Sequence, residues 1–294
     1  MSVVTSAPTR IDLAGGTIDI WPLYLFHDGA ATLNVAISLR AHAGVEPRND
    51  GRIELVSVDT GRRIGAARWS DLDGSSALTI AAVAALARWS ESSYEADDLL
   101  QIAMNIECQT IRVPTGVQDY RPALFGGIAA VELNVDGIRR VALDVDPREL
   151  QRRIVLAYTG APRNSGTNNW DITKRHVDGD RAIFDCFERI RDTAAAMREA
   201  LLRGDWDEVG RQIDREWDNR KRLAPGVTTE AIDGLMTRAK RAGATAAKVC
   251  GAGGGGCLFC YGPPDVRDSV AAALTAGGAR VLEYRIDMEG LRVG

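Results

Sequence analysis

The sequence lacks the features that would place it at a membrane or on nucleic acid. No window approaches the roughly 18 uninterrupted apolar residues that a membrane helix needs, and Met1 to Thr9 lacks the cationic start and apolar run of a signal peptide. The 36 Lys and Arg residues do not exceed the 40 Asp and Glu residues, and the net charge is −4. No dense basic block is present, so we expect neither nucleic acid nor a membrane as a partner.

A disulfide framework is also missing. The chain has five cysteines, an odd number at irregular spacing. Cys257 and Cys260 form a C-x-x-C pair inside an apolar run, with no second pair and no nearby histidine. We therefore expect buried strand cysteines rather than a zinc or redox site, and a reducing cytoplasm as the location.

What remains is an ordinary globular composition of 294 residues, with 45% apolar and 26% charged residues, which excludes disorder. Helices are predicted over 76–89, 96–112, 182–203, 206–222, 229–242 and 264–276, and strands over 30–45, 52–58, 127–133, 153–158, 246–249, 257–261 and 280–286. A turn at 49–51 predicts that strand 52–58 pairs with strand 30–45. The order of elements predicts an α+β fold with two lobes and a βαβ-like end.

The run from Gly251 to Gly256, GAGGGG, fits the dinucleotide pattern G-x-G-x-x-G. That pattern requires a helix directly after the loop, whereas Cys257 begins a predicted strand, so we reject a dinucleotide site. A loop with almost no side chains can lie against a phosphate or another backbone. The alternative is a tight turn between two strands.

Two further groups of residues carry chemistry. Glu107 lies in a predicted helix, and Asp119 follows a Pro-Thr-Gly break; each suits general-base or metal work, but each alone is more often a solvated or capping group. Arg10 and Asp12 alternate with apolar residues, so a strand would place both on one face. The alternative is an edge strand with a solvated face.

Three motifs appear together and in order along the chain. Residues 7–19 read APTRIDLAGGTID, residues 115–120 read TGVQDY with FGG at 125–127, and residues 248–257 read KVCGAGGGGC. In these motifs the chain resembles the GHMP small-molecule kinases, and among them the heptose 7-phosphate kinase-like sugar kinases. The resemblance covers nearly the whole sequence.

The resemblance implies a two-lobed GHMP kinase fold, with a lobe like ribosomal protein S5 domain 2 over 1–150 and a ferredoxin-like lobe over 151–294. It also implies transfer of the γ-phosphoryl group of ATP, with Mg²⁺, to a hydroxyl of a sugar or sugar phosphate.

Site residues follow from the same resemblance. Asp119 would be the catalytic base, with Arg10 beside it to lower its pKa and stabilise developing charge. Glu107 would hold Mg²⁺ together with Ser75 or Ser76. The remaining expected contacts are, for ATP, Ser75, Ser76, Gly251, Gly253, Gly254 and Gly255, and, for the acceptor, Asp19, Gly16 and Arg163.

One motif departs from the family. A Pro-x-x-x-Gly-Leu-Gly-Ser-Ser loop should precede the helix at 76–89 and cradle the triphosphate, but residues 69–77 read WSDLDGSSA, and Asp71 and Asp73 stand where phosphates should dock. Residues 59–74 are also too few for the helix and strand that the family places there. A segment of a few tens of residues is thus missing near Gly74–Ser76, either from the protein itself or from its printed sequence.

Rival functions stay open for this reason. One is a non-catalytic sugar-binding or regulatory protein on the kinase fold, and another is a kinase of a non-sugar alcohol such as mevalonate or homoserine. Around the acceptor, residues 163–169 (RNSGTNN) either bind it or form a surface loop, and residues 174–176 are expected as a solvated helix end. Trp21, Trp170 and Trp206 are expected to pack mostly in the core, with a pocket wall as the alternative. A homo-oligomer stays open.

Overall fold

The computed structural model describes residues 2–49, 54–56, 63–65, 76–161 and 167–294, and it contains two main antiparallel sheets. The first has the order β11-β1-β2-β5-β6. Its strands are β1 (Val3–Ala14), β2 (Ala31–Val45), β5 (Ile128–Asn134), β6 (Gly137–Ala142) and β11 (Arg292–Val293).

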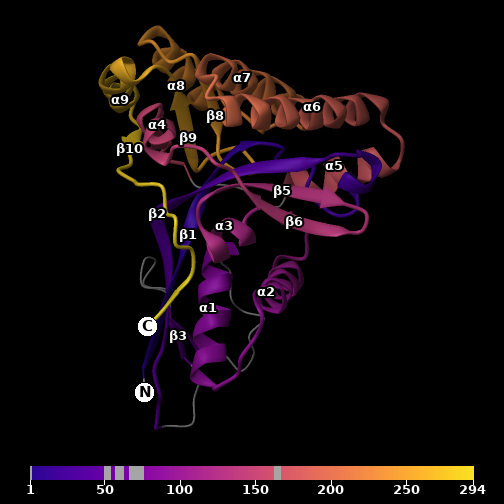
Figure 1. Ribbon diagram of the computed structural model, residues 1–294, viewed down its shortest axis with the longest axis vertical. Helices are drawn as coiled ribbons and strands as arrows, with labels where there is room; N and C mark the ends of the chain where they lie inside the picture. The colour runs from indigo at the N-terminus through magenta and orange to yellow at the C-terminus, as the bar shows by residue number, and fades with distance from the viewer. Residues whose placement is uncertain (1, 50–53, 57–62, 66–75, 162–166) are drawn as a thin grey trace.

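Helices cover the first sheet on both faces (Figure 1). On one face lie α1 (Ser76–Trp89), α2 (Ala96–Ile111) and α3 (Tyr120–Phe125). The alanine-rich α1 allows close approach to the sheet, and its Ile80 and Ala81 are fully buried. The opposite face contacts α6 (Arg181–Arg203) and α7 (Trp206–Leu223).

The second sheet has the order β10-β7-β9-β8, from β7 (Ile154–Tyr158), β8 (Ala246–Val249), β9 (Cys257–Tyr261) and β10 (Arg280–Val281). The remaining helices are α4 (Pro147–Arg152), α5 (Thr167–Val177), α8 (Glu230–Arg241) and α9 (Arg267–Ala276), with single 3₁₀ turns η1 (Leu23–Phe26) and η3 (Pro264–Val266). Side chains cap the starts of α4, α6, α7 and α8, as in Asp180, which accepts N–H bonds from Ala182 and Ile183 at the start of α6.

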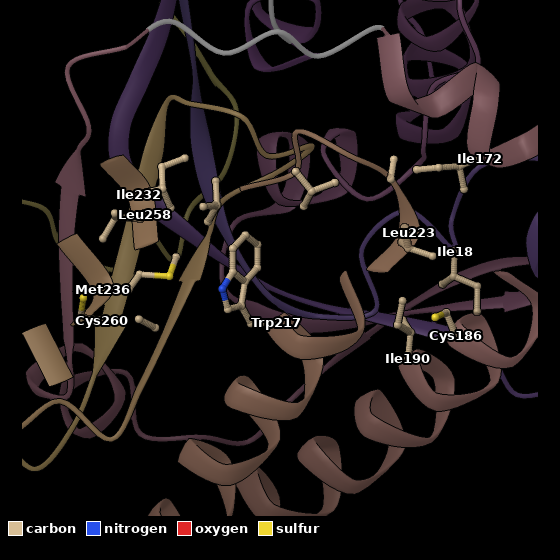
Figure 2. Close-up of a cluster of buried hydrophobic side chains, with 14 of the residues drawn as sticks. Ile18, Ile172, Cys186, Ile190, Trp217, Leu223, Ile232, Met236, Leu258 and Cys260 are labelled. Carbon is tan, nitrogen blue, oxygen red and sulfur yellow. The ribbon is translucent and has the colours of Figure 1, made fainter. Parts of the chain in front are cut away.

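One hydrophobic core joins the two sheets. Figure 2 shows Ile18, from the loop after β1, near Cys186 and Ile190 of α6. Trp217 of α7 belongs to the same cluster and is 5% exposed. The segment after β1 is therefore packed against the C-terminal helices, which brings residues 15–20 to the boundary between the lobes.

A register shift in β1 also positions the site. The pairing with β2 is irregular between Pro8 and Thr9, where the partner changes from Arg40 to Ile37, and such an irregularity bends and twists the strands locally. Ala7 packs with α1, α2 and α3, whereas Ile11 and Leu13 pack with α6, β7 and β9. The alternating residues Arg10 and Asp12 are thereby turned away from the core of Ile11 and Leu13.

Most predicted elements are confirmed within two or three residues, including α1, α2, α6, α7 and α8. The pairing predicted for strand 52–58 is wrong: its described part, β3 (Glu54–Val56), pairs with β4 (Arg63–Gly65). The predicted strand 280–286 is confirmed only as β10, because the chain then leaves the second sheet and Ile286 forms a bridge with Ile37 in β2.

Candidate active site

Arg10 and Asp119 form the centre of the candidate site. Arg10 donates from Nε to Oδ1 of Asp119 at 2.6 Å, and its second terminal nitrogen is also 2.6 Å from that oxygen. The side chain of Arg10 is 8% exposed, while that of Asp119 is 29% exposed. Asp119 stands at the start of α3 but makes no capping hydrogen bond with its side chain. Its carboxylate is therefore held by Arg10 and open to solvent on its other side.

Arg10 stays charged although it is buried. Burial disfavours the guanidinium, but the carboxylates of Asp119 and Asp12 outweigh it and raise the pKa of Arg10. Nη1 of Arg10 also donates a hydrogen bond to Oδ1 of Asp12 at 2.8 Å. The strand alternation thus places both side chains together as predicted, but in a buried position and not on a solvated edge.

Asp19 lies beside this pair. Its Oδ2 accepts the backbone N–H of Gln118 at 2.9 Å, and its Oδ1 is buried without a hydrogen-bond partner among the described residues. Gly116 approaches the same carboxylate so closely that a Cβ would stand 1.9 Å from Oδ2. Burial raises the pKa of Asp19 to about 6, and the charge of Asp119 adds to this rise. The hydrogen bond from the Gln118 N–H acts in the opposite direction.

Gly16 lies in the same loop, at the boundary between the lobes. A Cβ on Gly16 would stand 2.5 Å from a terminal nitrogen of Arg220 in α7. A side chain at position 16 would therefore require this guanidinium to move. The structure therefore gives Gly16 a packing role, and its predicted contact with the acceptor stays a prediction.

Glu107 is the third carboxylate near the site. Its Oε1 accepts a hydrogen bond from the hydroxyl of Ser76 at 3.1 Å, and its Oε2 accepts one from Tyr120 at 2.7 Å. Tyr120 is fully buried, and burial together with the charge of Glu107 raises its pKa. The two oxygens of Glu107 are thus bound by hydroxyls, and the carboxylate is neither a cap nor freely solvated.

The pair of Glu107 and Ser76 fits Mg²⁺ by its chemistry, because carboxylate and hydroxyl oxygens are hard ligands. Within the described ranges, no three His, Cys, Asp or Glu side chains gather into a metal-binding group. Mg²⁺ usually binds through one or two protein carboxylates plus waters and phosphates. The two protein oxygens are therefore sufficient for an ion that a nucleotide also holds.

The glycine loop is the turn of the β8–β9 hairpin. Gly254 donates its N–H to the carbonyl of Val227, and Gly256 donates to that of Ala161, both at 2.9 Å. A Cβ on Gly253 would stand 2.4 Å from the same Val227 oxygen. These glycines are required by close backbone packing in the C-terminal lobe. A contact of this loop, including Gly255, with ATP stays a prediction.

Several expected positions fall outside the described residues: Ser75, Arg163, and the two aspartates Asp71 and Asp73. The helix end at 174–176 is partly a wrong prediction. Lys174 is exposed, but His176 is 5% exposed and its Nε2 lies 2.9 Å from Nε2 of His27. The two histidines of this pair lie far apart in the sequence, so no local pattern predicts their contact.

The tryptophan prediction is also corrected. Trp21 and Trp170 are 67% and 62% exposed, so neither packs in the core. Trp206 is half-buried, under the guanidinium of Arg153 at 4.6 Å from its ring centre. The contact between η1 and α5 leaves the two exposed indoles on neighbouring segments.

Sequence reasoning missed the charged side chains behind Arg10. Lys248 lies in β8 and is fully buried, and Glu216 and Arg220 lie on the buried face of α7. The signals were a lysine inside the apolar strand 246–249 and two charges at the spacing of the apolar residues of α7. Each such residue on its own reads as surface.

Comparison with known proteins identifies the family. The model of the GHMP kinase N-terminal domain matches residues 72–127, and that of the GHMP kinase C-terminal domain matches residues 197–280. The chain belongs to the GHMP kinase family. This agrees with the three motifs and with the fold of two lobes.

Relatives with known names match most of the chain. D-glycero-alpha-D-manno-heptose 7-phosphate kinase of Campylobacter jejuni is 26% identical over 99% of this chain and 98% of its own. A mevalonate kinase of Pyrococcus abyssi is 23% identical over 82% of this chain and 72% of its own. A crystal structure of a D-glycero-D-manno-heptose 1-phosphate kinase from Bacteroides thetaiotaomicron has a TM-score of 0.75 at 23% identity, covering 99% of this chain and 98% of its own, which shows the shared fold.

The alignment with the Campylobacter relative spans 340 positions, against 294 residues in this GHMP kinase. Several tens of positions are therefore occupied in the relative alone.

In the part of the chain that the structure describes, no helix has both the length and the apolar character to cross a membrane.

Proposed function

We propose that this GHMP kinase transfers the γ-phosphoryl group of ATP to a hydroxyl of a sugar or sugar phosphate similar to a heptose phosphate. The observation that carries this proposal is the pair of Arg10 and Asp119, in which a buried guanidinium holds a partly exposed carboxylate that caps no helix. A general base needs to reach its proton and to be ionised when it does.

In the proposed reaction, Asp119 takes the proton of the acceptor hydroxyl as its oxygen attacks the γ-phosphorus. Arg10 keeps the carboxylate in place and supplies fixed positive charge beside the reacting oxygens. Asp19, with one buried oxygen unpartnered, accepts a hydrogen bond from a second hydroxyl of the acceptor. This contact orients the attacking hydroxyl toward Asp119.

Glu107 and Ser76 are the residues that would hold Mg²⁺. When bound, the ion neutralises charge on the phosphate oxygens. Ser75, Ser76 and the N-terminus of α1 are the proposed contacts of the triphosphate. The loop 251–256 and Arg163 are proposed to face the phosphates and the acceptor.

The names of the relatives support the acceptor class. The full-length relative is a heptose 7-phosphate kinase, and a structural neighbour is a heptose 1-phosphate kinase. Mevalonate kinases also match over most of this chain, so a non-sugar alcohol is the competing acceptor.

An acceptor panel tests the proposal. The protein is incubated with Mg·ATP and, separately, with heptose 7-phosphate, heptose 1-phosphate, galactose, mevalonate and homoserine, and ³¹P NMR follows the product. We expect transfer to a sugar or sugar phosphate that Asp119→Asn abolishes. Transfer only to mevalonate or homoserine would overturn the sugar assignment, and no transfer to any acceptor would overturn the kinase proposal.

A non-catalytic sugar-binding protein is the second candidate, because the Gly-Leu-Gly-Ser-Ser loop is absent from the sequence. It predicts that the protein binds a sugar phosphate in calorimetry without hydrolysing or transferring ATP. The two candidates therefore differ in one measurement on the same protein.

A further inference from the structure

The carboxylate of Asp12 joins the two lobes behind the catalytic pair. Its Oδ1 accepts one hydrogen bond from Nη1 of Arg10 at 2.8 Å and another from the backbone N–H of Gly251 at 2.9 Å. Its Oδ2 accepts a hydrogen bond from Nζ of Lys248 at 2.9 Å. The same Nζ also donates to the backbone carbonyl of Asp12 at 2.9 Å. One buried side chain of β1 thus holds a residue of β8 and the start of the glycine loop.

The charges continue into the C-terminal lobe. Nζ of Lys248 lies 3.6 Å from Oε1 of Glu216, and neither side chain is exposed. Acidic and basic side chains therefore alternate in one line: Asp119, Arg10, Asp12, Lys248 and Glu216. Asp119 is the most exposed member of this line, with 29% of its side chain exposed, against 8% for Arg10.

The groups that face Asp12 hold it ionised. Burial raises the pKa of its carboxyl, but the charges of Lys248, Arg10 and Arg220 outweigh burial and bring that pKa below its ordinary value. The nearby Glu216 and Cys250 are the other titratable groups at this position, and burial raises the pKa of both. A buried line of charges is stable only while each has its neighbours.

We propose that Lys248 is a positioning residue for phosphoryl transfer: it holds Asp12, and Asp12 in turn holds Arg10 in place against Asp119 and fixes Gly251. Lys248 acts only through Asp12 and touches neither reacting group. A residue of the C-terminal sheet therefore sets the geometry of the catalytic pair in the N-terminal lobe. The kinetic part of this inference rests on the proposed kinase function.

The kinetic test compares wild type, Lys248→Met and Lys248→Arg. Loss of the ammonium leaves only Arg10 and Arg220 to balance Asp12, which draws Arg10 from Asp119; small misplacement of a catalytic group costs about 10²-fold. We expect kcat of Lys248→Met to fall by about that factor while both KM values change little, and Lys248→Arg to restore part of the loss. The acid side of the pH profile of kcat should move to higher pH, which a merely structural defect would not cause.

Lys240→Met is the matched control. Lys240 lies on α8 and bonds to both oxygens of Asp214, at 2.8 and 2.6 Å, but on the surface. The same substitution there should leave kcat and the pH profile at wild-type values. If Lys248→Met fails to fold, the double variant Lys248→Met with Glu216→Gln removes two opposite charges together and should show the same loss of kcat.

A second readout needs no activity. Cys250–Gly251 is the single Cys-Gly sequence in the chain, so labelling with ¹³C-carbonyl cysteine and ¹⁵N-glycine gives one amide signal, from the N–H that Asp12 accepts. We expect this signal to stay constant from pH 5 to 8 in wild type and in Lys240→Met, and to shift with pH in Lys248→Met as Asp12 titrates.

The outcomes separate the two proposals. A wild type that transfers phosphate, with Lys248→Met equal to it in kcat, pH profile and Gly251 signal, would overturn the positioning role alone. A wild type that phosphorylates no acceptor would overturn the kinase function, whatever the Gly251 signal does.

Discussion

Gly116 and Asp19 are in contact closer than any side chain at position 116 would permit. A Cβ on Gly116 would stand 1.9 Å from Oδ2 of Asp19 and 2.5 Å from its carboxyl carbon. The bridge between Ile20 and Gly116 fixes the two segments at this separation. The position of the Asp19 carboxylate therefore depends on a residue that has no side chain.

Gly116→Ala should displace Asp19 and weaken the acceptor site. Loss of a hydrogen bond to a charged group costs about 1.5–3 kcal/mol, so we expect the acceptor KM to rise by roughly 10- to 150-fold with the ATP KM little changed. Steady-state kinetics with each substrate varied measures both. Gly234→Ala, in α8 with nothing within 4 Å of its Cβ, is the control and should behave as wild type; an unchanged acceptor KM in Gly116→Ala would remove Asp19 from the acceptor site.

Asp19 should make the folded protein less stable as pH rises. Its native pKa is about 6, above the unfolded value of about 3.9, so the native state binds the extra proton between these values. The free energy of unfolding then falls from about pH 4 to pH 6, by up to about 3 kcal/mol. Asp19→Asn cannot titrate, so it should gain stability relative to wild type over this range.

Urea unfolding at pH 4 and pH 7.5 measures this difference. Asp136→Asn, which removes an exposed carboxylate, controls for the loss of one negative charge. If Asp19→Asn and wild type keep the same difference in unfolding free energy at both pH values, the burial of an ionisable Asp19 is contradicted.

Asp119→Asn should fold normally, because its side chain is partly exposed and caps no helix. Removal of a general base lowers turnover by about 10²- to 10⁴-fold. Circular dichroism checks the fold, and phosphate transfer to the acceptor gives kcat. Turnover close to wild type would exclude Asp119 as the base.

Arg10→Ala should lower kcat by a similar factor with little effect on ATP affinity, because Arg10 acts on Asp119 and on developing charge. Calorimetric titration with Mg·ATP provides the affinity, and kinetics provides kcat. A selective loss of ATP binding would instead move Arg10 to the nucleotide site.

The chain as printed should bind Mg·ATP no better than millimolar. Asp71 and Asp73 lie outside the described residues, but the sequence aligns them with the phosphate loop of the family. A carboxylate at ~4 Å from a phosphate costs about 4 kcal/mol at a dielectric of ~20, whereas a helix N-terminus stabilises a phosphate by about 0.3–2 kcal/mol. A variant with Gly-Leu-Gly-Ser-Ser and its preceding helix and strand inserted should bind in the micromolar range. Calorimetry compares the affinities of the two proteins. Micromolar binding by the printed chain would mean that the phosphates dock elsewhere. Separately, an intact mass above 31.7 kDa for the natural protein would reveal a longer chain.

The elements predictable from sequence are those with a local cause. The alanine-rich run gives α1 its length, and alternation in β1 places Arg10 and Asp12 together. Strand β6 escaped prediction because Gly137–Ala142 is exposed and charged, and it forms only by pairing with β5. Its cause is a neighbour and not its own sequence.

The candidate site divides in the same way. Arg10, Asp19 and Asp119 stand in motifs, and the structure brings them together. Lys248 begins the third motif, but its partner Asp12 lies far along the chain, as does His27, the partner of His176. A single sequence does not show which residues form such pairs, since a buried charge and a surface charge have the same letter.

The pairing of β11 with β1 joins the first strand that is synthesised to the last one. Thr5 and Ser6 leave the ribosome early, but their partners Val293 and Arg292 are made only after the second sheet and its helices. During translation the outer edge of β1 stays without its neighbour, and such an edge is prone to pair with other chains. Joining the two ends with a short linker and opening the chain at the β5–β6 turn would make this edge close early, and would show how far the nascent protein depends on it.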